Sequence, residues 1–380
     1  MTEFGTLTKT KEKITTLAFE RVFRGNAVPA GTLIMSFKLT IGRVATLGID
    51  ACHNEAIISI RPKPGVDQRF LGYFLGSVDY RALQDRAVKG NTLNQEKIDR
   101  IEIWLPALEE QSSIADVLDL LKRSVAIQDD ALAQARQLKS ATMRNIFAWG
   151  LRGEAQKETL IGPMPESWEP RTILELCEIW SGGTPRKSVL EYWGGDIPWV
   201  SGKDLKRPSL DDAIDHVTPE GVAAGTRLAP AGAVFVLVRG MGLAKDLPVA
   251  LINRPMAFNQ DVKALISRGA VDGSFLRSAI YLGKERLLSR IVPSAHGTMT
   301  LNLQDIETFE VPCPSSRAEA EEIASVLDAI DHKIDLHRRK RAALDELFRA
   351  LLHKFMTGEV SLAELDLSAL APKRSAKAGV

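Results

Sequence analysis

The chain of 380 residues repeats one plan twice, and this internal repeat limits what it can fold into. The tripeptide at 29–31 recurs at 230–232, an offset of 201 residues (230 − 29 = 201). The hexapeptide at 114–119 recurs with one change at 323–328, an offset of 209 residues (323 − 114 = 209). Four further matches follow in the same order: Asn54 with Asn259, Phe70 with Phe275, Leu93 with Leu301, and Gly153 with Gly358. A duplication with small loop insertions produces such a series, so two copies of one structural unit are predicted.

Each copy has the same order of predicted elements. Apolar, largely β-branched runs of strand length lie at 33–37 and 56–60 in copy one, and at 234–238 and 262–266 in copy two. A helix is predicted next (69–85; 274–290), then a strand (101–105; 309–311), a proline stop and a long helix. This order predicts an α+β chain with two mixed α/β domains in tandem, each followed by a long helix. The predicted boundaries are 1–106 (first domain), 107–155 (long helix), 156–314 (second domain), 315–360 (second long helix) and 361–380 (flexible tail).

Apolar side chains recur at heptad spacing in both long helical segments. Neither apolar face is wide enough to stabilise a helix alone, so the two helices are predicted to pack on each other. Leu138 continues the first seam, and His337 and Arg341 are polar positions on the second, where they would set the register. The predicted packing positions are Ile114, Leu118, Leu121, Val125, Leu132, Ile330, Ile334, Leu344, Phe348, Leu351 and Phe355.

The composition excludes several classes of protein. Lys and Arg total 49 against 48 Asp and Glu, a net charge of +1, which argues against a uniformly basic nucleic-acid coat but not against a local basic face. Three distant cysteines build neither a disulfide framework nor a zinc site. The longest apolar run, 233–238, is far shorter than the ~20 residues of a membrane span, and the N-terminal segment lacks the apolar core of a signal peptide. A cytoplasmic protein without membrane attachment is expected.

The sequence carries no catalytic motif that we could find. Phosphate-binding glycine loops, the hydrolase nucleophile elbow, the zinc-protease helix and the tetrapeptide of amino-methyltransferases do not occur. The six histidines do not pair with acidic or thiol residues at metal-ligand spacing. We therefore predict no catalytic residue, no metal ligand and no cofactor-binding residue in the chain.

Copy two opens with an unusual loop segment. Trp168 precedes SGGTP at 181–185, YWGG at 192–195 and IPWV at 197–200. Glycines permit unusual backbone angles, the Thr-Pro pair closes a turn, and aromatic rings flank the loop. Arg186 and Lys187 follow the turn directly and would project from it. The tryptophans could equally be ordinary core residues of a packed turn.

These motifs, with FNQ at 258–260, a Gly-x-x-x-Leu loop, the helix entry around 106–114 and long helices that end in Gly-Glu, resemble a type I restriction–modification specificity subunit over nearly the whole chain. The resemblance implies two target-recognition domains that each read one half of a bipartite site in double-stranded DNA. It also implies that the long helices form an antiparallel coiled coil that spaces the half-sites and docks two modification methyltransferase subunits and, through them, restriction/translocase subunits. S-adenosylmethionine, ATP and Mg²⁺ would then belong to those partners, with no cofactor in this chain.

The resemblance does not identify the residues that read DNA, since recognition domains differ wherever their targets differ. We nominate polar residues on loops beside the predicted strands, because Arg and Lys suit guanine edges or phosphates and Asn suits adenine. In copy two these are Thr184, Arg186, Lys187, Lys203, Arg239, Lys245, His296 and Thr298. In copy one they are Lys38, Arg43, Lys89, Asn91 and Thr92.

The two copies differ at their starts. By the repeat alignment residue 1 corresponds to about residue 202, so the segment 168–199 has no counterpart in copy one, and an N-terminally incomplete first domain is expected. Another chain or a second copy of this one could supply the missing part, so self-association is one possibility. The chain could also be a truncated form with one working domain, or its start could be wrongly set.

Two other functions stay open at this stage. One is an enzyme of unrecognised type, such as a stand-alone nuclease or methyltransferase, which would turn over substrate without partners. The other is a coiled-coil adaptor that no longer reads DNA, which would leave no footprint on a duplex. Within the specificity-subunit interpretation, a further alternative is a subunit that reads only one half-site instead of both.

Overall fold

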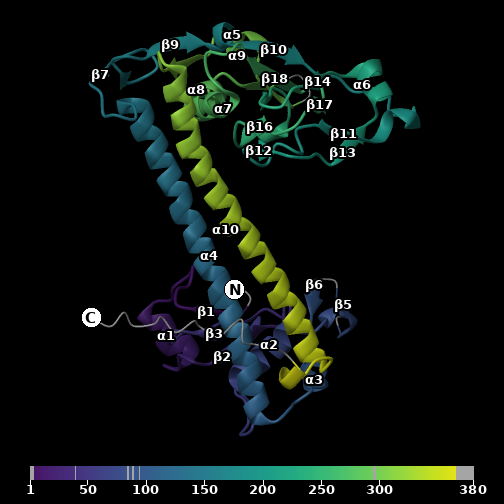
Figure 1. Ribbon diagram of the computed structural model, residues 1–380. Helices are drawn as coiled ribbons and strands as arrows, with labels where there is room; N and C mark the ends of the chain where they lie inside the picture. The colour runs from purple at the N-terminus through teal and green to yellow at the C-terminus, as the bar shows by residue number, and fades with distance from the viewer. Residues whose placement is uncertain are drawn as a thin grey trace, which may run out of the picture. The chain divides into compact units, whose positions relative to one another are not determined.

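The computed structural model of the chain describes residues 4–38, 40–83, 85–87, 90–93, 95–293 and 297–364 (Figure 1). It divides into two compact units, residues 1–130 with 339–380 and residues 131–338, which we call the first and the second unit. Helices α4 (Leu108–Trp149) and α10 (Arg317–Thr357) have 42 and 41 residues. The first part of α4 and the last part of α10 belong to the first unit, and the remainder of each helix belongs to the second unit.

The main sheet of the second unit has five strands in the order β10–β18–β15–β16–β12. Four of them pair antiparallel, and the outermost strand β12 joins β16 in parallel. All four residues of β15 are apolar and buried, and α7 (Gly273–Leu282) packs on β15 and β16. The strand bounds are β10 (Cys177–Ser181), β12 (Ser209–Leu210), β15 (Val234–Leu237), β16 (Val249–Ile252) and β18 (Val262–Ser267).

A second sheet of the same unit has the order β13–β11–β17–β14. Its strands are β11 (Trp193–Val200), β13 (Asp215–Val217), β14 (Leu228–Ala229) and β17 (Met256–Phe258). Three short strand pairs, β7–β8, β9–β21 and β19–β20, and several short helices complete the unit. Their bounds are β7 (Gln156–Lys157), β8 (Met164–Pro165), β9 (Glu169–Thr172), β19 (Val292–Pro293), β20 (Met299–Thr300), β21 (Glu310–Cys313), α5 (Ile173–Leu176), α6 (Pro219–Gly225), α8 (Lys284–Leu288), α9 (Leu303–Glu307), η2 (Leu190–Tyr192) and η3 (Met241–Ala244).

The first unit contains a four-stranded sheet in the order β1–β3–β2–β4. β2 is antiparallel to both of its neighbours, and β1 joins β3 in parallel. The bounds in this unit are β1 (Gly5–Leu7), α1 (Thr16–Phe23), β2 (Leu33–Ser36), β3 (Val44–Leu47), β4 (Ile57–Ile60), α2 (Gln68–Ser77), η1 (Tyr80–Leu83), β5 (Asp85–Ala87), β6 (Gly90–Thr92), α3 (Gln95–Asp99) and η4 (Leu362–Glu364).

The repeat is visible in the strand order. Strands β1, β3, β2 and β4 correspond to β12, β16, β15 and β18, with the same neighbours and the same directions. The single bridge between Val28 and Ala51 stands where β14 pairs with β17. The predicted fold class, two mixed α/β domains with long helices, is therefore confirmed. Among the described residues of the first unit, no strand lies along β4 where β10 lies along β18.

Three predicted elements differ from the structure. Residues 101–105 were expected to form a strand, but they have no regular structure. Their counterpart β21 pairs with β9, whereas no described strand of the first unit pairs with 101–105. The helix predicted at 69–85 ends at Ser77, and an extended residue follows. The helix predicted at 274–290 is divided at Gly283, where a Cβ atom would lie 2.7 Å from the ring of Phe309.

The long helices pack on each other within each unit. In the first unit Ile114, Leu118 and Leu121 share a core with Leu351 and Phe355, so the start of α4 meets the end of α10 and the helices run antiparallel. In the second unit Met143 and Phe147 of α4 share a core with Ile323 and Leu327 of α10. The other predicted packing positions are buried (Leu132) or half-buried (Val125, Ile330, Ile334, Leu344, Phe348).

Leu138 was expected on the first seam but is 54% exposed. The contact face at this level carries Ala135, Lys139 and Met143, and Lys139 Nζ donates to Asp331 Oδ1 at 2.6 Å. At this level the helix contact is therefore an ion pair of Lys139, and the adjacent apolar residue Leu138 points away from it. In the first unit, Arg341 Nε pairs with Asp129 Oδ1 at 3.1 Å, so this seam residue does take a polar role.

Candidate functional site

Several loops of the second unit emerge at one end of its main sheet. Ser181 pairs with Lys263 and Leu237 pairs with Val262, so β10 and β15 both end where β18 begins. The Val238 amide donates to the Asp261 carbonyl at 2.8 Å, which continues this alignment beyond the strands. The loops that follow β10 and β15 therefore lie beside the turn that precedes β18.

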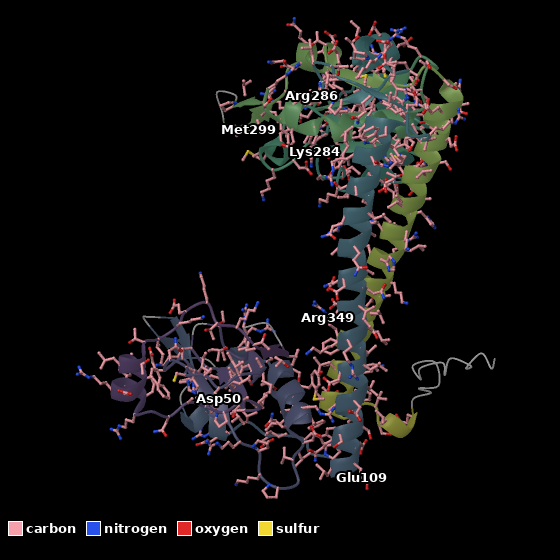
Figure 2. The ribbon with its side chains drawn as sticks, turned by 90° about the vertical axis from the view of Figure 1, so that its left-hand side faces the viewer. Asp50, Glu109, Lys284, Arg286, Met299 and Arg349 are labelled. Carbon is pink, nitrogen blue, oxygen red and sulfur yellow. The ribbon has the colours of Figure 1, made fainter. Side chains whose placement is uncertain are left out.

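Two more segments join the same end. The Asn259 amide donates to the Val200 carbonyl at 2.9 Å, which places the segment after β11 there. The Gly240 amide donates to the carbonyl of Met299, a residue labelled in Figure 2, at 3.0 Å. We call this region, residues 182–189, 201–204, 238–245, 259–261 and 297–301, the loop end of the second unit. It contains seven of the eight predicted residues of copy two: Thr184, Arg186, Lys187, Lys203, Arg239, Lys245 and Thr298. His296 lies outside the described residues.

The glycines of the SGGTP loop are required by close backbone contacts. A Cβ atom on Gly182 would lie 2.2 Å from the Phe258 carbonyl oxygen, and one on Gly183 would lie 2.2 Å from that of Gly225. Both distances are far below van der Waals contact. The loop is therefore pressed against two neighbouring backbone segments, and its position depends on the absence of side chains here.

The tryptophans that follow the loop are structural. Trp199 is buried, and its Nε1 donates to the Gly183 carbonyl at 3.0 Å. Trp193 packs edge-on against Trp199 with the ring centroids 5.1 Å apart, and its Nε1 donates to the Arg186 carbonyl at 3.3 Å. The aromatic residues thus hold the loop backbone, and the side chains of Arg186 and Lys187 are exposed.

The cations at the loop end differ in their partners. Lys203 Nζ pairs with Asp215 Oδ2 at 2.7 Å, and this hydrogen bond raises the pKa of Lys203. Among the described residues, no side-chain partner is found for Arg186, Lys187, Arg239 or Lys245, which are all exposed. Four unpaired cations in one region form the local basic face that the balanced net charge permits.

Gln260 of the loop end and Lys263, at the start of β18 beside it, were not singled out as ligands by the sequence. The Thr184 hydroxyl donates to the carboxamide oxygen of the exposed Gln260 at 2.7 Å. Lys263 Nζ donates to the Ser181 hydroxyl at 2.7 Å, and burial lowers the pKa of this lysine against the opposing effect of Asp261. The sequence signals for this turn were the repeat match of Asn54 with Asn259 and the FNQ motif at 258–260, and neither gave a chemical role.

The predicted residues of copy one are less well assembled. Lys38 and Arg43 lie in the connection between β2 and β3, which corresponds to the connection between β15 and β16 in the second unit. Lys38 is half-buried with its Nζ 5.6 Å from the ring centroid of Phe37, and Arg43 is exposed. Asn91 and Thr92 lie on β6, which pairs with β5. Lys89 lies outside the described residues.

Each domain is attached to the long helices through a repeated acid. In the second unit Asp328 accepts hydrogen bonds from Ser274 at 2.6 Å and from Arg277 at 3.0 Å. In the first unit its counterpart Asp119 accepts from Tyr73 at 2.5 Å and from Arg69 at 3.1 Å. The sequence repeat contained both acids but did not indicate that they face the domains.

Within the described ranges, no group of three or more His, Cys, Asp or Glu side chains is arranged to hold a metal ion. The same residues include no helix with the length and hydropathy needed to cross a lipid bilayer.

Comparison with known proteins gives a consistent result. The family model described as the type I restriction modification DNA specificity domain matches residues 6–137 and 165–346. The chain is 27% identical over 233 residues to the EcoR124I/EcoR124II specificity subunit of Escherichia coli. This alignment covers 60% of this chain and 57% of that subunit. It is 29% identical over 210 residues to the MjaIX specificity subunit of Methanocaldococcus jannaschii. This alignment covers 53% of this chain and 47% of that subunit. The alignments thus span only about half the length of these two relatives.

Solved structures show the same fold. The S subunit of a type I restriction–modification system from M. genitalium superposes with a TM-score of 0.62 at 16% identity, over 93% of this chain and 88% of that one. A chain from a solved type I restriction–modification system superposes with a TM-score of 0.51 at 18% identity, over 88% and 84%.

Proposed function

Because the chain belongs to the type I restriction–modification DNA specificity family, we propose that it selects the DNA target of such a complex and catalyses no reaction itself. Its ligand is double-stranded DNA with a bipartite site, and each unit reads one half. The proposed function places the chain in the cytoplasm, where its DNA target lies.

The observation that carries the proposal is the gathering of polar side chains at the loop end. Arg186, Lys187, Arg239 and Lys245 come from two separate loops, are exposed and have no partner among the described side chains. Arginine can donate two hydrogen bonds to guanine, and both cation types can neutralise phosphates. The tryptophan-supported SGGTP loop gives two of these residues a fixed backbone, which sequence reading requires.

The long helices would also serve the assembly of the complex. We propose that they set the separation of the half-sites and dock two modification methyltransferase subunits, and that restriction/translocase subunits join through these. S-adenosylmethionine, ATP and Mg²⁺ would be bound by those partners. The basic run at 337–341 supports a protein-facing or solvated role, because Arg338 pairs with Asp335 and Arg341 pairs with Asp129.

The proposal is tested by co-expressing the chain with methyltransferase and restriction subunits and mapping the methylated positions of the host genome. A methylated motif with two specified parts and a gap of constant length is the expected result. Methylation that does not depend on the chain would contradict the proposal. Turnover by the isolated chain would favour an enzyme, and a chain that leaves no footprint on DNA would favour an adaptor.

A second candidate is a subunit that reads one half-site until a strand is added to its first unit. The outer edge of β4 and the exposed segment with Ile103 and Leu105 favour it, since their counterparts β18 and β21 are covered by β10 and β9. The added strand could come from a second copy of the chain. A methylated half motif or a palindrome, with self-association in solution, is the outcome that would support this candidate.

A further inference from the structure

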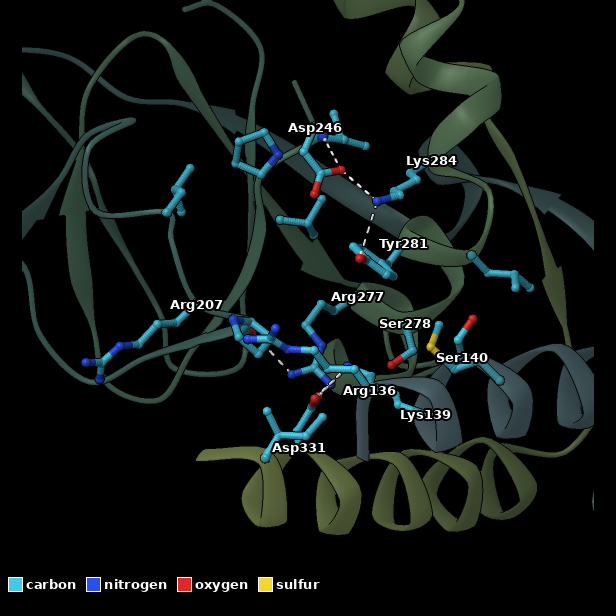
Figure 3. Close-up of a pocket in the computed structure, with 18 of the residues that line it drawn as sticks. Arg136, Lys139, Ser140, Arg207, Asp246, Arg277, Ser278, Tyr281, Lys284 and Asp331 are labelled. Carbon is cyan, nitrogen blue, oxygen red and sulfur yellow. Dashed lines mark hydrogen bonds and ion pairs between the residues drawn. The ribbon is translucent and has the colours of Figure 1, made fainter. Parts of the chain in front are cut away.

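A cleft of about 790 Å³ lies in the second unit between the domain and the long helices (Figure 3). One wall is formed by α7, α8 and the loop segments 205–208 and 246–249, and the other by α4 and α10. Two of these segments continue from the loop end, because Lys203 lies just before 205–208 and Lys245 directly precedes Asp246. The cleft is therefore a continuation of the proposed DNA-reading surface toward the helices.

The lining is strongly basic. Eight of its residues are Arg or Lys, and three are Asp or Glu. Asp331 is shared by Lys139 and Arg277, and Asp246 pairs with Lys284 at 2.7 Å, as Figure 3 shows. Arg338 pairs with Asp335. Two of the three acids in the lining, Asp246 and Asp331, thus pair with the less exposed cations Lys139, Arg277 and Lys284. The third, Glu285, is exposed and forms no ion pair with a described residue.

Four exposed cations at the cleft have no acidic partner among the described residues: Arg136, Arg144, Lys206 and Arg207. Within the described part of the chain, Arg144 donates to the Ser140 hydroxyl alone, at 2.8 Å. Arg136 and Arg144 are two helical turns apart on α4, a rise of about 12 Å. That distance covers three or four phosphates of one DNA strand, which are spaced about 3.4 Å apart along the duplex axis.

The first unit shows that the fold does not require an open cleft here. Phe4 directly precedes β1, as 206–208 precede the corresponding strand β12. Its ring packs on Tyr73 and Phe348, with centroids 5.2 and 6.0 Å away, and so fills the space between the domain and a long helix. Where the first unit has this aromatic cluster, the second has Lys206, Arg207 and an open, basic cleft.

We propose that this cleft binds the phosphate backbone of the DNA whose bases are read at the loop end. The inference rests on the proposed function and adds the residues Arg136, Arg144, Lys206 and Arg207 to it. Guanidinium groups bind phosphate oxygens with paired, charge-assisted hydrogen bonds, and such contacts position a duplex without reading its sequence. An acidic surface of a protein partner is the competing occupant, and the experiment separates the two.

The test uses the full chain and a duplex of arbitrary sequence, because phosphate contacts do not depend on the target. Binding is measured across salt concentrations for the wild type, for Arg136→Gln/Arg207→Gln, and for the control Arg171→Gln/Arg268→Gln. The control removes the same charge from the same unit. Both control residues are 51% exposed and paired with glutamates, and Arg268 lies beside Leu176, where β10 begins, at the opposite end of the sheet.

For the cleft variant, the slope of log K against log salt should become shallower by about 0.9 for each lost contact, hence by about 1.8 in total. The control should keep the wild-type slope. Equal slopes for the wild type and the cleft variant would overturn the proposal, as would an equal change in the control. So would loss of the methyltransferase partner from the cleft variant with DNA binding intact. A wild-type chain that binds no duplex, alone or with that partner, would instead contradict the proposed function.

Discussion

Arg277 of α7 donates a hydrogen bond to Asp328 of α10 at 3.0 Å, and its guanidinium also lies 2.9 Å from Asp331. The arginine side chain is only 4% exposed, so the charge is buried between the domain and the helix. Lys139 of α4 reaches Asp331 from the other side. One cluster of charges thus joins the second domain to both long helices.

Replacing Arg277 with methionine should destabilise the second unit. The substitution keeps most of the side-chain volume but leaves Asp328 and Asp331 with one buried cation fewer, and breaking such a pair costs about 3 kcal/mol. Urea unfolding measures the loss. The control Arg290→Met removes an arginine that is 41% exposed and 3.8 Å from Asp305, and should cost less than about 1 kcal/mol. Equal losses for the two variants would show that the buried cluster contributes nothing specific.

The helix caps Asp67 and Asp272 hold corresponding positions in the two units, yet their pKa values shift in opposite directions. Burial raises the pKa of Asp272, the Phe275 amide opposes this, and Asp328 and Glu321 add to it. Burial also opposes ionisation of Asp67, but hydrogen bonds from Phe70, Ser112 and Arg69 outweigh it and lower the pKa. The same cap is therefore favoured as a carboxylate in one unit and disfavoured in the other.

The asparagine variants should show this difference in their pH dependence. Asp67 contributes stability above its unfolded pKa and loses it as the pH falls through its lowered folded value. Asp67→Asn should therefore cost about 1 kcal/mol at neutral pH and less in acid. Asp272 loses stability as the pH rises through its raised folded value, so Asp272→Asn, which still caps the helix, should cost nothing at neutral pH or stabilise. Urea midpoints at neutral and acidic pH measure both, and equal costs at neutral pH would contradict the assignment.

The core strands of both domains could be predicted because the same apolar pattern occurs at matching positions in both copies of the repeat. Runs of β-branched residues at matching positions predicted β2 and β4 and their counterparts β15 and β18, all of which occur. The exposed chain at 101–105 was predicted as a strand for the same reason. It is not a strand, because a strand must pair with a neighbour and none of the described strands pairs with it. The apolar pattern of a segment does not indicate whether such a neighbour is present.

The charged contacts could not be predicted from periodicity. An apolar pattern favours Leu138 at the helix contact, whereas the structure uses Lys139, whose charge is neutralised by an acid nearly two hundred positions away. The basic cleft was missed for a related reason. Its cations come from α4, α7, α8, α10 and the loop before β12, which no local motif connects. By contrast, seven loop residues of copy two could be nominated because they are polar and lie beside predicted strands, and the structure shows that these loops emerge at one end of the unit.

Alanine at Gly183 should displace the SGGTP loop. Its Cβ atom would lie 2.2 Å from the Gly225 carbonyl, a backbone atom that cannot rotate away. Such overpacking costs about 1–3 kcal/mol, and the displaced loop should carry Arg186 and Lys187 out of position, so DNA binding should weaken with stability. Ser188→Ala, at an exposed position of the same loop, is the control and should change neither. A fully stable Gly183→Ala variant with wild-type DNA affinity would contradict the role assigned to the glycines.

Alanine at Lys187 or at Arg239 should weaken binding of the cognate duplex, once methylation mapping has given its sequence. Both side chains are exposed at the loop end, and their removal breaks no side-chain hydrogen bond or ion pair with a described residue. A residue that contacts a phosphate should weaken binding to all sequences and make the salt slope shallower by about 1. A residue that reads a base should cost about 1–3 kcal/mol on the cognate duplex alone. Arg317→Ala, an exposed and ion-paired residue at the start of α10, is the control. Unchanged affinity and an unchanged slope for both variants would exclude the loop end as the surface that reads DNA.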